Sequence, residues 1–141
     1  MIIYAESSAV LAWLLGESKA RMIRSILRKA TVVVASELTL IECDRVLIRS
    51  VALNEMTEKQ ASNRRTRLNT AAAHWNILRL APEITVRARR RFPIEPIRTL
   101  DALHLASAIL AASAAQEFAI VSLDQRLRDN AIEMGLPVLP E

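Results

Sequence analysis

The chain has 141 residues, a formal net charge of +4 and only two glycines, which lie too far apart for a Gly-rich phosphate loop. Dinucleotide-binding and P-loop sites are therefore excluded, and a single cysteine excludes an internal disulfide and a cysteine-rich zinc site. The length predicts one domain over residues 1–141, and the longest apolar run, 102–115, is shorter than the ~20 residues that span a bilayer. We expect a cytoplasmic protein without a targeting segment.

Strands and helices are predicted to alternate along the chain. In chain order, we expect a strand at 2–5, helices at 7–15 and 18–29, a strand at 32–35, helices at 36–51, 57–78 and 82–91, a loop at 92–98, a helix at 99–114, a strand at 118–123, a helix at 124–134 and a strand at 136–139. Gly16 is the expected end of the first helix, and Ser36 and Thr99 are expected caps of later ones.

The predicted strands are apolar without alternation, which is typical of parallel strands buried on both faces. Their alternation with helices indicates a sheet covered by helices on both sides. The predicted fold class is therefore α/β, a three-layer α/β/α sandwich with a mostly parallel central sheet. In such sheets, functional sites form just beyond the carboxyl ends of the strands.

Four acidic residues are predicted to lie near that edge of the sheet. Glu6 follows the first strand, Glu42 lies in the helix after the second, and Asp124 follows the strand at 118–123. Asp101 begins a helix that is apolar nearly all round and should be buried. Glu42 lies on an apolar stripe of its helix, where a lone carboxylate would be costly.

Each acid taken alone has a purely structural explanation. Asp101 suits the positive end of a helix dipole, and Asp124 suits an N-cap. Glu42 could pair with Arg45, and Glu6 could be an ordinary loop residue. Taken together, two carboxylates ~4 Å apart repel by about 4 kcal/mol at an effective dielectric constant of ~20. A cluster of four indicates a cation among them, and carboxylate oxygens favour Mg²⁺ or Mn²⁺, with metal-assisted phosphodiester hydrolysis as the natural chemistry.

A resemblance to a known family is carried by four segments: 3–9, 36–39 with Glu42, 98–106 and 121–127. The most specific segment reads Arg-Thr-Leu-Asp-Ala-Leu-His-Leu-Ala from Arg98 to Ala106. At these residues the sequence resembles the PIN-domain family, and within it the VapC-type toxins of bacterial toxin–antitoxin pairs. The resemblance covers essentially the whole chain.

The resemblance implies an α/β/α sandwich and an endoribonuclease that depends on Mg²⁺ or Mn²⁺. The catalytic, metal-binding acids of the family carry over to Glu6, Glu42, Asp101 and Asp124. Ser7 and Ser122 occupy positions where the family has Ser or Thr near the metal, so they are expected to support it. The implied partners are an RNA substrate, a cognate antitoxin protein and a second copy of the chain in a homodimer.

Glu6 departs from the family pattern, in which the first acid is usually aspartate. The extra methylene moves the carboxylate away from its strand, which shifts or weakens metal binding. This departure favours an alternative function, a catalytically weak PIN-like module that binds RNA or a protein partner without cutting. A phosphate-receiver domain is disfavoured, because the only lysines are Lys19, Lys29 and Lys59, far from the last strand.

Arginine supplies 16 of the 19 basic residues, and its planar guanidinium suits phosphate groups. The clusters at 64–67 and 87–91 are either solvated helix faces or a track for an RNA backbone. The candidates for contacts to the RNA backbone are Arg89, Arg90, Arg91 and Arg98.

Three further residues are expected to be structural. His104 is predicted to be a buried, hydrogen-bonded histidine rather than a metal ligand, because a site of oxygen ligands needs no imidazole. Cys43 is predicted to be a small buried hydrophobe. Trp13 is expected in the core, although its helix could instead form a groove for an amphipathic antitoxin segment.

Overall fold

The computed structural model describes all residues, 1–141, and contains one five-stranded sheet. The elements in chain order are β1 (Ile2–Ala5), α1 (Ser7–Leu15), α2 (Ala20–Lys29), β2 (Val32–Ser36), α3 (Glu37–Ala52), α4 (Glu58–Ala72), β3 (Asn76–Leu78), α5 (Pro82–Ala88), α6 (Thr99–Ser113), β4 (Phe118–Val121), α7 (Gln125–Glu133) and β5 (Val138–Leu139). None of the helices is both long and apolar enough to cross a membrane.

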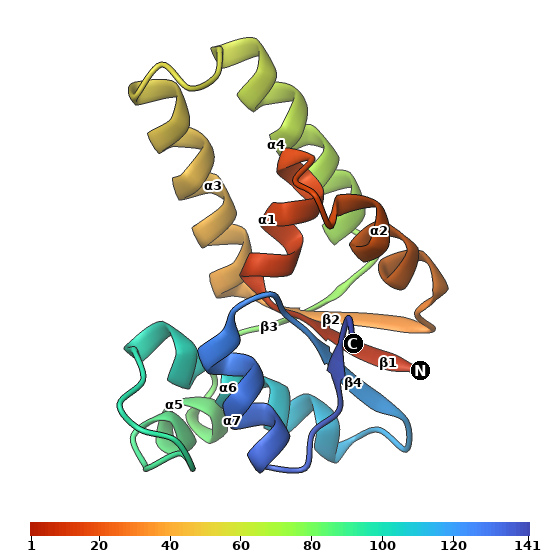
Figure 1. Cartoon of the computed structure of the whole chain (residues 1–141), viewed down its shortest axis with the longest axis vertical. Coiled ribbons are helices and arrows are strands. Elements are labelled where there is room, and N and C mark those ends of the chain that lie inside the picture. Colours follow the sequence, from red (N-terminus) through yellow and green to blue (C-terminus); the bar gives the residue numbers. More distant parts are fainter.

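The sheet has the strand order β3-β2-β1-β4-β5, and all paired strands run parallel. The first strand of the chain is thus the central one, with Tyr4 opposite Val34 on one side and Ile120 on the other. Helices α1 to α4 lie on one side of the sheet and α5 to α7 on the other (Figure 1). The predicted three-layer α/β/α sandwich is confirmed.

Two cores fill the space between the sheet and its helices, because successive side chains of a strand point to opposite faces. Ile3 and Ala5 pack into the core beneath α1 to α4. Tyr4 and Ile120 pack into the core on the side of α6 and α7. Tyr4 is therefore a fully buried side chain in the middle of the molecule, one residue from the end of the central strand.

Three helices begin within a few residues of a strand end at the carboxyl edge of the sheet, and each is capped by a polar side chain. Glu6 caps α1, and Asp124 caps α7. Ser36 caps α3 by accepting the amide of Leu38 at 3.1 Å, as predicted. Gly16 ends α1 in the left-handed conformation, with φ of 69°, also as predicted. Several helix N-termini, with their positive dipole ends, thus meet at this edge.

The helix predicted over 57–78 is wrong in its last six residues, 73–78. Helix α4 ends at Ala72, and Asn76–Leu78 forms the edge strand β3, which pairs with β2. Three residues carry too weak a local pattern to reveal a strand, and the backbone groups of β2 that β3 satisfies belong to a distant segment.

Smaller corrections concern element ends, where local signals are weakest. Helix α5 ends at Ala88 rather than at 91, and strand β4 ends at Val121 rather than at 123. The N-cap of α6 is Arg98, not Thr99, which is the first residue of that helix.

Candidate active site

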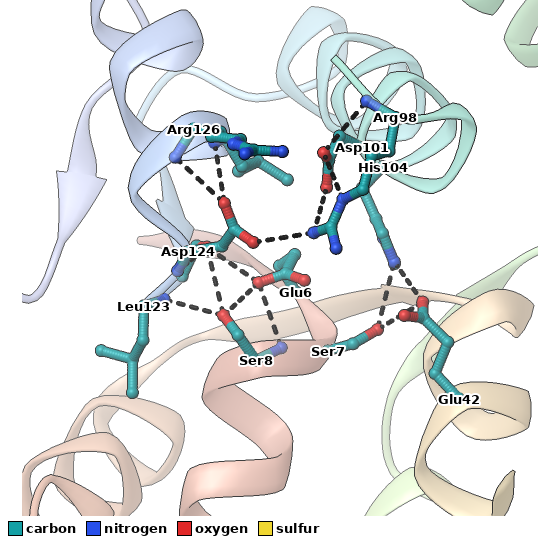
Figure 2. A network of polar contacts seen from close by, with 12 residues as sticks. Glu6, Ser7, Ser8, Glu42, Arg98, Asp101, His104, Leu123, Asp124 and Arg126 are labelled. Atoms are coloured by element: carbon teal, nitrogen blue, oxygen red, sulfur yellow. Dashed lines mark hydrogen bonds and ion pairs between the residues drawn. The ribbon is translucent and has the colours of Figure 1, made fainter. Parts of the chain in front are cut away.

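Four carboxylates from four segments of the chain lie in one polar network at the carboxyl edge of the sheet (Figure 2). Glu6 and Asp101 are buried, with 6% and 4% of their surface exposed. Glu42 and Asp124 are half-buried, and their side chains reach the solvent. The structure therefore brings the four predicted acids to the same edge, but each has partners of its own.

Glu6 directly follows the central strand and is held by hydroxyl groups on both sides. Its carboxylate accepts the backbone N–H of Ser8 at 3.1 Å and a short hydrogen bond from the Ser8 hydroxyl. The Ser122 hydroxyl, at the end of β4, donates to the same oxygen of Glu6 at 2.8 Å. Glu6 is thus the cap of α1 and a member of the site at once, rather than an ordinary loop residue.

Asp101 and Asp124 share one guanidinium group. The Arg98 Nε donates to Asp101 Oδ2 at 3.2 Å, and the Arg98 Nη2 donates to Asp124 Oδ2 at 3.2 Å. Asp124 uses its other oxygen to cap α7, where it accepts the amides of Arg126 and Leu127. Figure 2 shows the Arg98 side chain lying between the two aspartates. A chain cation therefore compensates this part of the acidic cluster.

Glu42 is held from the protein interior. Its Oε1 lies 2.6 Å from His104 Nε2 and accepts the Ser7 hydroxyl at 2.8 Å. His104 is 2% exposed, and its Nδ1 lies 2.8 Å from the Tyr4 hydroxyl. An ionised carboxylate only accepts hydrogen bonds, so the Nε2–H of His104 donates to Glu42. In the neutral imidazole the Tyr4 hydroxyl then donates to Nδ1.

The electrostatics of these contacts agree with an ionised Glu42 that accepts hydrogen bonds from His104 and Ser7. Burial alone would raise the pKa of Glu42, but the hydrogen bond and charge of His104 and the hydrogen bond from Ser7 outweigh it, so the net pKa is lowered. Burial raises the pKa of Tyr4 above its ordinary value, which keeps the phenol protonated. His104 is the buried, hydrogen-bonded histidine that was predicted, and it replaces Arg45 as the partner of Glu42.

The donor set fits a hard divalent cation in chemistry but not in its present arrangement. Carboxylate oxygens are the ligands that Mg²⁺ and Mn²⁺ prefer. No three acidic, histidine or cysteine side chains of the chain converge closely enough to hold a metal ion. Glu42 faces His104, Glu6 faces two serines, and the aspartates face Arg98. Side chains must therefore move before a metal ion could bind.

Several residues of the network escaped sequence reasoning. The Ser8 hydroxyl accepts the amide of Leu123 at 2.8 Å and joins the segment after β4 to α1. Arg98 was expected to contact RNA, although its spacing of three residues from Asp101 is also that of a helical ion pair. The contact between Tyr4 and His104 joins residues 100 positions apart, so no local pattern could reveal it.

The two arginine clusters have different surroundings. Arg89, Arg90, Arg91 and Arg98 line one cavity of about 510 Å³ beside α5 and α6, which also contains Phe92. Because Arg98 reaches both this cavity and the aspartates, the predicted RNA-contact residues lie next to the acidic network. The cluster at 64–67 serves the helical layer instead, since Arg65 pairs with Asp44 at 3.7 Å.

A second cavity, of about 530 Å³, lies among α1, α2 and α4. The indole rings of Trp13 and Trp75 form part of its wall, with centroids 6.4 Å apart, and Arg67 lies over the Trp13 ring at 5.3 Å. Trp13 is thus only half-buried, whereas Leu14 beside it is in the core. Cys43 is buried as predicted, and burial raises the pKa of its thiol to about 12.

Comparison with known proteins places this geometry in context. The sequence profile of the PIN domain matches residues 3–133, which is most of the chain. No curated protein matches the chain significantly in sequence.

Three solved structures share the fold of the chain. VapBC2 of Rickettsia felis, bound to a DNA fragment from its promoter, has a TM-score of 0.65 at 10% identity, over 98% of this chain and 97% of that one. VapC20 of Mycobacterium tuberculosis, a toxin that cleaves the sarcin–ricin loop, has a TM-score of 0.63 at 14% identity, over 90% and 93%. A toxin–antitoxin complex from Klebsiella pneumoniae has a TM-score of 0.63 at 15% identity, over 98% and 96%. At these identities the similarity is one of fold.

Proposed function

Since the chain belongs to the PIN-domain family, we propose that it is a metal-dependent endoribonuclease and the toxin of a type II toxin–antitoxin pair. One observation carries the proposal: Glu6, Glu42, Asp101 and Asp124 come from four segments and meet at the carboxyl edge of a parallel sheet. Sites of α/β proteins form at this edge. VapC20, which has the same fold, is a toxin that cleaves the sarcin–ricin loop.

The four carboxylates are the residues that would hold Mg²⁺ or Mn²⁺. When bound, such an ion activates a water molecule and neutralises the charge that builds up on the phosphate. The chain itself holds two of these carboxylates near the edge of the sheet: Ser7 and His104 contact Glu42, while Ser122 contacts Glu6. All of these supporting groups are buried, so their hydrogen bonds are shielded from water.

RNA would approach over the cavity beside α5 and α6. Arg89, Arg90 and Arg91 line it together with Arg98, and guanidinium groups bind phosphate oxygens well. Because this cavity adjoins the acidic network through Arg98, a backbone held there would lie beside the carboxylates. The arginines would contribute affinity that depends on salt concentration rather than on base sequence.

An antitoxin protein is the proposed regulatory partner, as in the VapBC2 and Klebsiella assemblies that share the fold. The cavity among α1, α2 and α4 suits an amphipathic segment with acidic residues, because Arg24, Arg28 and Arg67 surround its two tryptophans. A homodimer and a cytoplasmic location complete the proposal.

The function is tested with the Asp101→Asn variant. The purified chain should cleave RNA in the presence of Mg²⁺ or Mn²⁺ and stop when the metal is chelated. Asp101→Asn should lower cleavage at least about a hundredfold and relieve growth arrest, with the circular dichroism spectrum unchanged. Asp129→Asn is the matched control, because Asp129 contacts only Gln125 and lies outside the four acids. Full cleavage by Asp101→Asn would refute the assignment.

A second function is favoured by Glu6, namely a module that binds RNA or a protein without cutting. One oxygen of its carboxylate, Oε2, already accepts hydrogen bonds from Ser8 and Ser122 within the chain. The Glu6→Asp variant separates the two functions. A large gain in manganese affinity and cleavage would show that the native site is compromised, whereas unchanged cleavage would show that glutamate serves as well.

A further inference from the structure

Arg98 is the one guanidinium that contacts carboxylates of the acidic network, and it contacts two. Its Nε and Nη2 donate to Asp101 at 3.2 and 3.4 Å, and Nη2 also donates to Asp124 at 3.2 Å. The hydrogen bond to Asp101 is the main cause that raises the pKa of Arg98, with the charges of Asp101 and Asp124 adding to it. The side chain is nevertheless 64% exposed, so no packing locks it in this position.

The contacts of Arg98 with Asp101 and Asp124, called the Arg98 bridge below, compensate the negative charge of these two aspartates. Two carboxylates that face each other repel strongly unless a cation lies between them. Here the guanidinium supplies that charge, and its planar fork reaches both partners at once. With the bridge formed, no three acidic, histidine or cysteine side chains lie close enough together to hold a metal ion.

We propose that Arg98 is a built-in counter-cation that closes the metal-free site, so that a divalent cation must displace it from Asp101 and Asp124. The bridge is thus an autoinhibitory contact within the chain. The inference rests on the proposed function only in taking these aspartates as metal ligands. Asp101 also accepts the backbone amide of Arg98, at 3.3 Å, and this contact survives when the guanidinium leaves.

The displaced side chain has a defined place to go. Arg98 already lines the cavity that Arg89, Arg90 and Arg91 share, so a guanidinium released from the aspartates would face that cavity. There it would meet the phosphate groups of a bound nucleic acid, which offer the negative charge that it gives up. Metal entry and phosphate binding would thus favour the same position of Arg98, and each would strengthen the other.

The experiment measures Mn²⁺ binding to the full chain by calorimetry, without RNA, so that it does not depend on cleavage. The wild type is compared with Arg98→Gln and with Arg126→Gln. Arg126 is the matched control, because it lies beside Asp124 and carries the same charge but reaches that residue only through its backbone amide. If the bridge is closed in about 90% of molecules, its removal raises the apparent affinity about tenfold.

We therefore expect Arg98→Gln to bind Mn²⁺ about tenfold more tightly than the wild type, and Arg126→Gln to differ by less than about threefold. Arg98→Lys keeps the charge but cannot span both aspartates, so a smaller gain is expected. Equal affinities of Arg98→Gln and Arg126→Gln, weaker binding by Arg98→Gln, or no Mn²⁺ binding by any variant would overturn the inference. Failure of the ribonuclease proposal would instead appear as absent cleavage by chains that bind Mn²⁺.

Discussion

The two halves of the acidic network compensate negative charge in different ways. Glu42 is held by His104 and Ser7, which are buried and are themselves tied to the core through Tyr4. Asp101 and Asp124 are held by Arg98, whose side chain is mostly exposed. The first half is part of the folded interior, whereas the second is closed by a group that can leave without disturbing the core.

The two halves of the network should affect different properties: one the stability of the fold, the other the binding of cations. A buried hydrogen-bonded group is costly to remove, because its partners are left unsatisfied. The Arg98 guanidinium is 64% exposed although Asp101 is buried, so water and salt screen this side of the ion pair and its contribution to folding is small. The inner half should therefore govern the stability of the site, and the outer half its access to cations.

The largest expected effect on stability comes from His104→Ala. The change opens a cavity, removes the contact of the Tyr4 hydroxyl with His104 and removes a donor from Glu42, so we expect a loss of about 3 kcal/mol in the free energy of unfolding. Arg98→Ala, the comparison variant from the outer half, should cost under about 1 kcal/mol. Urea unfolding measures both. Similar losses for the two variants would erase the distinction between the halves.

A smaller effect concerns pH and the inner half alone. The pKa of Glu42 is lowered in the folded state, so its ionised form contributes stability above the ordinary carboxyl pKa of ~4.3, and this contribution is lost as the pH falls through the lowered value. The stability difference between the wild type and Glu42→Gln should therefore shrink as the pH falls from about 6 to about 3. Unfolding midpoints across that range provide the check, and a difference that widens in acid would contradict the assignment of the lowered pKa.

The sequence was sufficient for the sheet and for the place of the four acids. Apolar runs without alternation identified β1, β2 and β4, and parallel strands bring the residues after them to one edge. Strand β3 was missed because its three residues are strand-like only next to β2. Sequence position also could not show how each acid is partnered, since the contact of Glu42 with His104 spans 62 positions.

Arg98 shows most clearly what could not be predicted from the sequence. Repulsion among the carboxylates requires a cation and led us to expect a metal ion, whereas in the structure a guanidinium of the chain lies between two of them. Both satisfy the same electrostatics, so charge alone cannot distinguish them. The reach of the Arg98 side chain toward both aspartates became visible only in the structure.

A crystal structure of the wild-type chain grown with MnCl₂ shows directly whether a divalent cation displaces Arg98 from Asp101 and Asp124, because manganese is located by its anomalous scattering. We predict a manganese ion bound by Asp101 and Asp124, with the Arg98 guanidinium withdrawn from both and facing the cavity of Arg89 to Arg91. A structure at saturating MnCl₂ with Arg98 still bridging the two aspartates, and with no manganese on them, would contradict it.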